Sequence, residues 1–445
     1  MQNDFTRGNV PALLMRFAIP IFLANLLQAC YSIADMAIVG RLVGSAGLTA
    51  IDNASRICFL ITSLCAGISI GGSVLVAQRK GAGDRQGLTE ATGTLFALTA
   101  IASIAMTVIC EVAGKPMLIA MRVPPEALPP AVDYLRTISL GTIFVFGYNS
   151  ICGVMRGLGD STSPLTYVAC TVLINIALDV LFVGPLGLGV RGAAIATVMS
   201  EAISFCLALS SVVGGSFPIK LKPSSLIPRR ESLGKILSIG IPQTIQMTVL
   251  NLSYAISSGL FNSYGIAVSA AAGIGLKVNT VVAMVCWAVG QAVMTMAGQN
   301  LGAKDVRRAA SSARWGIVVA LAAVSVAVLP IQIFTVNVVS AFNGDASVVR
   351  EGVRYLRIAC SLNFMLYAVM YVLDSFATGA GDSSFAMMNA MLHSVVMRLC
   401  LSVLLSIGLG MGCVGLYWGE SLSPILSCLV GIGYFASGFW KRRKR

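Results

Sequence analysis

A few acidic and amide side chains stand inside long apolar runs of this sequence, and these residues are the best placed to do chemistry. Asp35 lies in the first such run, and Asn175 and Asp179 lie four residues apart in a later one. A charged side chain at the centre of a bilayer costs about 3 kcal/mol on insertion scales, so each one retained there is a functional candidate. A spacing of four puts Asn175 and Asp179 on one helical face. Thr197 falls at a similar depth in the next run, so we expect the four side chains to share one polar layer.

Two carboxylates in one buried layer disfavour double ionisation, because like charges repel strongly where the dielectric constant is low. A proton or a sodium ion relieves that repulsion, so the layer predicts a site for one of these cations. Inward movement of either ion releases about 2.3 kcal/mol per charge per 100 mV, which can drive another molecule outward. As alternatives, Asp35 is a carboxylate that reaches the membrane surface, and Thr197 is a hydroxyl bonded to its own helix backbone.

Other charged residues stand inside the apolar runs as well. Glu201 follows Thr197 by one helical turn and is a further candidate for the same site. Lys277, Arg398 and Glu420 lie in three different runs of the second half. Because a lone buried charge is costly, we predict that Glu420 pairs with Lys277 or Arg398. We interpret this pair as structural, with gating of a substrate as the alternative.

The runs that hold these residues have the length and composition of transmembrane helices. The chain has 445 residues, of which 56% are apolar and only 11% charged, whereas about a quarter of an ordinary soluble domain is charged. Runs of about 20 apolar residues cross a bilayer as helix. The predicted fold is an all-α polytopic membrane protein with twelve transmembrane helices, beginning near Met15, Ala54, Ala91, Val132, Pro164, Arg191, Lys235, Ala270, Ser312, Val353, Phe385 and Cys413.

The basic residues indicate how the chain is oriented. The 31 Lys and Arg residues give a net charge of +13, but they form short clusters between apolar runs and no continuous stripe, so no nucleic-acid partner is expected. Most clusters fall on the side of the N-terminus, which predicts a multi-pass protein of the cytoplasmic membrane with both termini inside. We expect no cleavable signal peptide, because the first run continues past any small-residue cleavage site. The twelve cysteines are scattered and the histidine is single, so neither disulfide nor metal chemistry is expected, and no cofactor.

The sequence repeats itself with an offset of about 222 residues. The loop AQRKGAGD from Ala77 matches GQNLGAKD from Gly298, and RGLGDSTS from Arg156 matches TGAGDSSF from Thr378. Each half holds six predicted helices, so the halves are parallel repeats about an axis along the membrane normal. We predict an N-lobe of residues 1–216, a cytoplasmic linker of residues 217–234 and a C-lobe of residues 235–445. Such folds usually bind a substrate between their lobes; a duplicated scaffold without transport is the alternative.

Matching prolines stand in the first helix of each half. Pro20 and Pro242 each remove one backbone hydrogen bond from a helix. We predict that Pro20 is a hinge. A fixed kink or a helix start is the alternative for both prolines.

These features together resemble the multidrug and toxic compound extrusion (MATE) family, and the resemblance covers essentially the whole chain. It rests on the twelve spans, on the Gly-Ala and Asp loop after the second helix of each half, and on the Gly-Asp loop after the fourth. It implies that Asp35, Asn175, Asp179 and Thr197 match an N-lobe proton or sodium site of prokaryotic members. Sodium-coupled members carry acids in helices seven and ten of the second lobe. Here Ser257 matches Asp35, and Asp374, the only acid of helix ten, lies too near its cytoplasmic end.

The resemblance implies a secondary active multidrug antiporter and not an enzyme. It would export lipophilic, often cationic small molecules in exchange for protons or sodium by alternating access, acting as a monomer in the lipid bilayer. A flippase for a lipid-linked precursor, from the same superfamily, is the alternative. A membrane-embedded enzyme or receptor is disfavoured, because neither a nucleotide-binding loop nor paired His and acid metal ligands occur in the sequence. Aromatic residues within the runs offer contacts to organic cations: Tyr31, Tyr148, Tyr254, Tyr367 and Tyr371.

Overall fold

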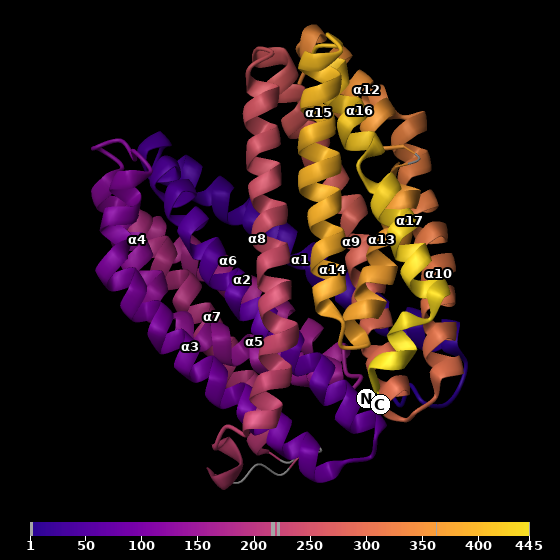
Figure 1. Cartoon of the computed structure of the whole chain (residues 1–445). Coiled ribbons are helices and arrows are strands. Elements are labelled where there is room, and N and C mark those ends of the chain that lie inside the picture. The colour runs from indigo at the N-terminus through magenta and orange to yellow at the C-terminus, as the bar shows by residue number, and fades with distance from the viewer. Residues whose placement is uncertain (1–2, 215–218, 220–222, 362, 445) are drawn as a thin grey trace. The chain divides into compact units, whose positions relative to one another are not determined.

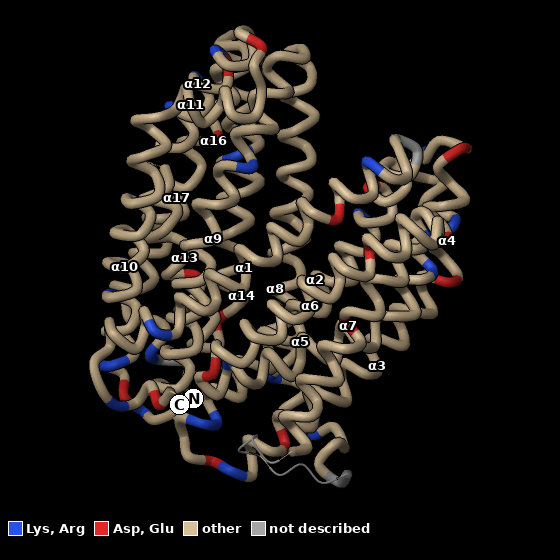
Figure 2. The backbone as a smooth tube through the Cα atoms, turned by 180° about the vertical axis from the view of Figure 1, so that it is seen from behind, with Lys and Arg blue, Asp and Glu red and all other residues tan. Residues whose placement is uncertain are grey.

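The computed structural model describes residues 3–214, 219, 223–361 and 363–444, and these residues are almost entirely helical (Figure 1). Within a bilayer no water satisfies the backbone N–H and C=O groups, so a chain this apolar must satisfy them along its own segments as helix. Figure 2 shows that charged residues gather at the ends of helices and that few lie along their middles. The all-α prediction is confirmed.

Nine helices of the described residues are long and apolar enough to cross a membrane. Seven are single elements: α1 (Val10–Leu42), α2 (Ser45–Gly81), α3 (Arg85–Ala120), α6 (Thr162–Val183), α7 (Gly189–Val213), α9 (Ile266–Gly302) and α10 (Val306–Ile333). The other two are the helices over Ser383–Gly408 and Cys413–Ser437. Their consecutive segments are α14 (Ser383–Met391), η2 (Leu392–Cys400), α15 (Leu401–Val403) and η3 (Leu404–Gly408), then α16 (Cys413–Leu422) and α17 (Pro424–Ser437).

The remaining predicted spans are two bent pairs and one more polar helix. Helix α4 (Leu128–Leu140) meets α5 (Thr142–Gly157) at 47°, and α12 (Ala346–Ala359) meets α13 (Asn363–Gly379) at 49°, so up to eleven described spans are apolar enough. The twelfth is α8 (Arg230–Asn262), which is 33 residues long but carries several Gln, Thr, Ser and Asn side chains. Short segments complete the chain: α11 (Thr335–Ser340), η1 (Pro223–Leu226) and η4 (Phe439–Lys444).

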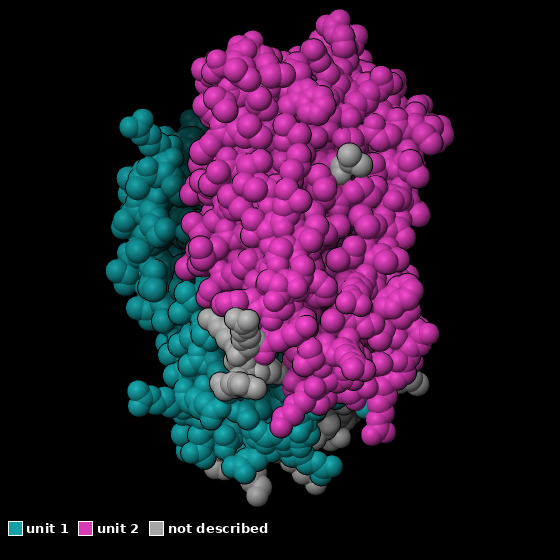
Figure 3. All heavy atoms as spheres, turned by 45° about the vertical axis from the view of Figure 1, so that its right-hand side comes forward, with its two compact units in different colours: residues 1–4, 23–244 teal, residues 5–22, 245–445 magenta. Residues whose placement is uncertain are grey.

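Contacts divide the chain into two compact units, coloured separately in Figure 3. Unit 1 comprises Met1–Asp4 and Leu23–Thr244, and unit 2 comprises Phe5–Phe22 and Ile245–Arg445. The cuts fall inside α1 and α8, shortly after Pro20 and Pro242, so both helices contribute to both units. The lobe bounds at 216 and 235 stay predictions. Both prolines lie inside helices that begin at Val10 and Arg230, so the helix-start alternative is wrong.

The predicted linker, residues 217–234, lies partly outside the described residues. Its last part differs from the prediction, because Arg230 already begins α8. The carboxylate of Glu231, in the first turn of that helix, contacts Lys235 (2.7 Å) and Arg79 of α2 (2.8 Å). These contacts extend the helix into the charged segment.

The central helix of each unit is α2 or α9, which are counterparts in the repeat. Their most apolar stretches are 67% and 78% buried, whereas those of the other seven unbroken apolar spans of the described residues reach at most 56%. Helix α2 packs against α3, α4 and α5, and α9 packs against α10, α12 and α13. Close packing needs small residues: a Cβ at Gly157 of α5 would lie 2.5 Å from the Ser73 carbonyl oxygen of α2, and one at Gly379 of α13 would lie 2.3 Å from that of Met294 in α9.

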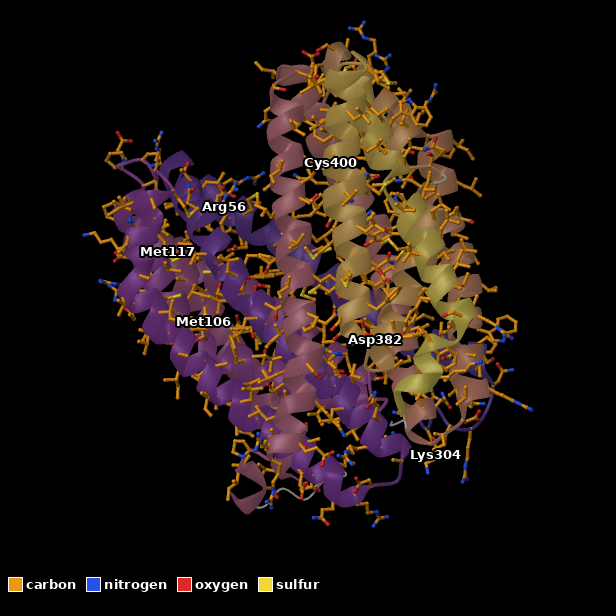
Figure 4. The ribbon with its side chains drawn as sticks, in the orientation of Figure 1. Arg56, Met106, Met117, Lys304, Asp382 and Cys400 are labelled. Carbon is orange, nitrogen blue, oxygen red and sulfur yellow. The ribbon has the colours of Figure 1, made fainter. Side chains whose placement is uncertain are left out.

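The repeated Gly-Asp loops have the same construction in both units. Gly159 and Gly381 have positive φ angles of 80° and 88°, a conformation that glycine adopts at least cost. The aspartate that follows accepts hydrogen bonds from backbone N–H groups of the next helix: Asp160 from Ser163 (3.0 Å) and Asp382 from Phe385 (3.4 Å). Asp382, labelled in Figure 4, therefore caps the start of α14.

Candidate functional site

Three helices of unit 1 meet in a small apolar cluster, and the predicted polar layer lies one helical turn from it. Val39 of α1, Val183 of α6 and Ala193 of α7 are buried against one another. Because residues four apart share a helical face, this packing brings the next residue on each face together as well. Those residues are Asp35, Asp179 and Thr197.

Asn175 joins Asp179 to the neighbouring helix α7. Both residues are buried, with 1% and 0% of their surface exposed. In the amide orientation that suits both neighbours, Asn175 Nδ2 donates to Asp179 Oδ2 (2.7 Å) and Asn175 Oδ1 accepts from the Thr197 backbone N–H (3.3 Å). Because of the i, i+4 spacing in α6, Asn175 can bond at once to the Asp179 carboxyl group of its own helix and to the backbone of α7.

The Asp35 side chain of α1 and the Asp179 side chain of α6 interact with each other. Two carboxylates are both hydrogen-bond acceptors, so a proton on one of them would favour their interaction. Neither group has a Lys or Arg partner within 4.0 Å in the described part of the chain. The Oδ1 atom of each aspartate is buried and has no hydrogen-bond partner among the described residues.

Thr197 reaches the site mainly through its backbone. Its hydroxyl donates to the Ala193 carbonyl one turn earlier (3.0 Å), as the backbone-bonded alternative predicted. The Tyr31 hydroxyl contacts the Thr197 side chain and interacts electrostatically with Asp35 and Asp179. The sequence indicates Tyr31 only as a possible aromatic contact to a substrate. Its position one turn before Asp35 on the same helical face is the sequence signal that points to this closer role.

Glu201 borders the layer and does not join the carboxyl pair directly. Its side chain is half-buried, and its Oε2 atom is fully buried with no hydrogen-bond partner among the described residues. It interacts electrostatically with Tyr31. The structure therefore places it beside the predicted site, at the edge that Tyr31 forms.

A cavity of about 520 Å³ within unit 1 reaches the site on the side of α1. Its walls include Tyr31, Asp35, Asp52 and Tyr134. Asp35 is half-buried at this wall, while Asp179 is fully buried. A cation in the cavity would therefore meet Asp35 before Asp179. Asp52 forms the exposed ion pair with Arg56 (3.1 Å) that its i, i+4 spacing indicates; Figure 4 labels Arg56.

The prediction that Glu420 forms an ion pair with Lys277 or Arg398 is wrong. Glu420 accepts a hydrogen bond from the Tyr355 hydroxyl, and among the described residues neither Arg398 nor Lys277 lies within ion-pair distance of it. Lys277 is exposed on α9. Arg398 instead covers the Tyr254 ring at 4.2 Å and donates to its hydroxyl (3.3 Å). Glu420 therefore contacts Tyr355 and Arg398 contacts Tyr254, in place of the predicted ion pair.

Asp374 is buried in α13, with 3% of its surface exposed, and accepts a hydrogen bond from Asn389 of α14 (2.8 Å). This contact lies within unit 2, and it holds together two helices that the Gly-Asp loop connects. Asp374 is therefore hydrogen-bonded to α14 and does not take part in the contacts of Arg398 and Glu420 described above.

Comparisons with known proteins agree along the whole chain. The MatE family model matches residues 20–181 and again residues 242–404, one match in each half of the repeat. The chain is 30% identical to the probable multidrug resistance protein YpnP of Bacillus subtilis, over 99% of this chain and 98% of that protein. It is 26% identical to the probable multidrug resistance protein YoeA of the same organism, over 96% and 94%. A crystal structure of a MATE protein in the straight conformation superposes with a TM-score of 0.93, covering 97% of each chain at 21% identity.

Proposed function

Because this chain belongs to the MatE family of membrane transporters, we propose that it is a secondary active antiporter that exports small organic molecules in exchange for a cation. Lipophilic and often cationic drugs are the proposed substrates. Two of its relatives carry names of multidrug resistance proteins, which supports this class over lipid-linked precursors. We place the transporter in the cytoplasmic membrane, as a monomer with both termini inside.

The contact between Asp35 and Asp179 is the observation that carries the proposal. Two carboxyl groups in contact, with no basic partner within 4.0 Å among the described residues, repel each other when both are ionised. At about 4 Å and an effective dielectric constant of 20 this repulsion is about 4 kcal/mol. A bound cation removes it, so the pair holds a cation in one state and can release it in another.

A proton is the coupling ion that the contacts favour. A proton on one carboxyl group would let it donate to the other, which removes the repulsion between them. A sodium ion would need several oxygen ligands, and the Asn175 oxygen faces the Thr197 N–H instead of the pair. We therefore propose proton coupling at Asp35 and Asp179, with Asn175 and the Thr197 backbone holding Asp179 in place.

Pro20 links this site to movement of the chain. It lies in the same helix as Asp35, close to the point where the contacts of α1 change from one unit to the other. A proline leaves one carbonyl of the helix unbonded and lowers the resistance to bending there. We propose that α1 bends at Pro20 when the charge of the carboxyl pair changes, which exposes the site to the two sides of the membrane in turn.

Efflux of ethidium from a bacterial strain that lacks its main exporters tests this function. Cells with the wild-type protein should accumulate less dye than cells with the empty vector. Asp35→Asn and Asp179→Asn should each return accumulation to the empty-vector level at equal amounts of membrane protein. Asp52→Asn, which changes an exposed acid of the same cavity, is the matched control and should keep efflux. Undiminished efflux in both site variants would refute the coupling role of the pair.

A further inference from the structure

Three buried polar side chains join three helices of unit 2. Asp374 of α13, Asn389 of α14 and Ser427 of α17 are 3%, 2% and 0% exposed. Asn389 Nδ2 donates to Asp374 Oδ1 (2.8 Å) and to the Ser427 carbonyl oxygen (3.1 Å), and the Ser427 hydroxyl donates to the Asn389 carbonyl oxygen (3.2 Å). These contacts lie where α13, α14 and α17 pack together (Figure 1). A single carboxyl group thus belongs to a network of neutral amide, hydroxyl and backbone groups.

Two oxygen atoms of this network have no hydrogen-bond partner among the described residues. They are Oδ2 of Asp374 and Oδ1 of Asn389, and both are buried from solvent. A buried acceptor without a donor is costly. Each of the two belongs to the same planar group as one end of the 2.8 Å hydrogen bond between these side chains. Both oxygens are acceptors while Asp374 is ionised, so a hydrogen bond between them needs an added proton.

No cation neutralises Asp374 in the part of the chain that the structure describes. None of the ion pairs within 4.0 Å there includes it. Helix α13 packs against α9, α10, α14 and α17, and the segments α14 and α17 carry no charged residue. The charged side chains of α9 and α10 are exposed or bond to the N-terminal segment: Lys277, Arg307, Arg314 and Arg308.

The titratable groups that interact with Asp374 are Tyr371 of its own helix and Cys428 of α17. A phenol and a thiol are ordinarily uncharged at neutral pH. An ionised Asp374 would therefore be a lone charge inside a membrane-spanning unit, which is strongly unfavourable.

The first half of the repeat has an uncharged residue at the matching position. The Gly-Asp loops align Gly159 with Gly381, and the same offset places Cys152 opposite Asp374 and Tyr167 opposite Asn389. Cys152 is buried, with 2% of its surface exposed. The helix before the loop thus has no charge at this position in unit 1, and a neutral Asp374 gives unit 2 the same property.

We propose that this network is a proton-binding site, in which Asp374 carries a proton on Oδ2 and donates a hydrogen bond to Asn389 Oδ1 while its own Oδ1 accepts from Asn389 Nδ2. The two planar groups then share two parallel hydrogen bonds, and both unpartnered oxygens gain a partner. The proton lets α13 bond to α14 without leaving a charge in the bilayer. Unit 2 thereby holds a proton of its own, and this site does not depend on the coupling role proposed for Asp35 and Asp179.

Infrared spectroscopy of the purified full-length protein in lipid nanodiscs tests the proposal. Aspartate that is isotope-labelled at its carboxyl carbon identifies the C=O stretching band of a protonated aspartic acid, which an ionised carboxylate lacks. Spectra are recorded at neutral pH in a protein that carries Asp35→Asn and Asp179→Asn, so that the pair of unit 1 contributes nothing. Failure of the coupling role therefore leaves this test intact.

Adding Asp374→Asn to that protein should remove labelled protonated-carboxyl intensity. Asp345→Asn, which changes an exposed acid of the same unit, is the matched control and should remove none. If Asp374→Asn leaves the protonated-carboxyl intensity unchanged, Asp374 is ionised and the proposal is overturned.

Thermal unfolding of single variants is a second measurement. In Asp374→Asn the new amide can replace the protonated carboxyl group, donating to Asn389 Oδ1 and accepting from Nδ2, so the unfolding temperature should stay within about 2 °C of the wild type. Asp374→Leu has a similar volume but leaves the Asn389 amide without this partner, and should lower the unfolding temperature by at least about 4 °C. A loss in Asp374→Asn as large as in Asp374→Leu, or failure of Asp374→Asn to fold, overturns the proposal, as does an unchanged unfolding temperature in Asp374→Leu.

Discussion

Replacing Asn175 with leucine tests the bridge that holds the carboxyl site together. The change keeps the volume of the side chain but removes one hydrogen bond to Asp179 (2.7 Å) and one from the Thr197 N–H (3.3 Å). A buried bond to an ionisable group contributes about 1.5 to 3 kcal/mol and a neutral one about 0.5 to 1.5 kcal/mol. We therefore expect Asn175→Leu to lower the free energy of unfolding by roughly 2 to 4 kcal/mol.

The assay is unfolding of the purified protein in mixed micelles as the fraction of denaturing detergent rises, followed by tryptophan fluorescence. Asn149→Leu is the matched control, because the amide of Asn149 donates to the Val145 carbonyl of its own helix (2.8 Å) and bridges to no other helix among the described residues. We expect that control to change the unfolding free energy by less than about 1 kcal/mol. Equal effects of the two substitutions would mean that Asn175 does not bridge α6 and α7 as described.

Two further predictions concern the repeated loops and the packing of unit 1, and both are measured as changes in thermal unfolding of the purified protein. Lys304, labelled in Figure 4, has a φ of 63° at the place where the first half has Gly83 with a φ of 68°. Lys304→Gly should stabilise the protein by about 0.5 to 1 kcal/mol, because it removes left-handed strain of about 1 to 2 kcal/mol at some cost in chain entropy; a lower unfolding temperature contradicts this. Gly157→Ala should destabilise by about 1 to 3 kcal/mol, since its Cβ would lie 2.5 Å from the Ser73 carbonyl oxygen. Gly234→Ala, with nothing within 4 Å of its Cβ, is the control, and a similar loss in both contradicts the packing explanation.

The sequence predicted the helices and the carboxyl layer because both depend on local pattern. Apolar length determines which segments can span a membrane, and the i, i+4 spacing puts Asn175 and Asp179 on one face. The bends at 47° and 49° are not predictable from the sequence, since an apolar run gives no sign of a break where Gly141 interrupts the helix between α4 and α5. Helix α8 begins earlier than the sequence predicts. Its charged first turn has the composition of a loop, and its contact with Arg79 of α2 is visible only in the structure.

The partners of isolated charges were not predictable from sequence. The cost of burial shows that Glu420 and Arg398 each need a partner, but it does not choose between an opposite charge and a phenol. The structure supplies Tyr355 and Tyr254, which lie far away in sequence. The same limit applies to Thr197, whose side chain bonds to its own helix and whose backbone N–H reaches the site.

Transport in proteoliposomes tests the carboxyl pair as the coupling site most directly. Purified protein is reconstituted with a pH-sensitive dye inside the vesicles, and proton and sodium gradients are imposed separately while movement of ethidium is followed. We predict that a proton gradient alone drives ethidium transport with opposite proton movement, and that Asp35→Asn and Asp179→Asn each abolish both. Ethidium transport that continues in both variants, or that persists after both gradients are collapsed, would contradict the role of Asp35 and Asp179.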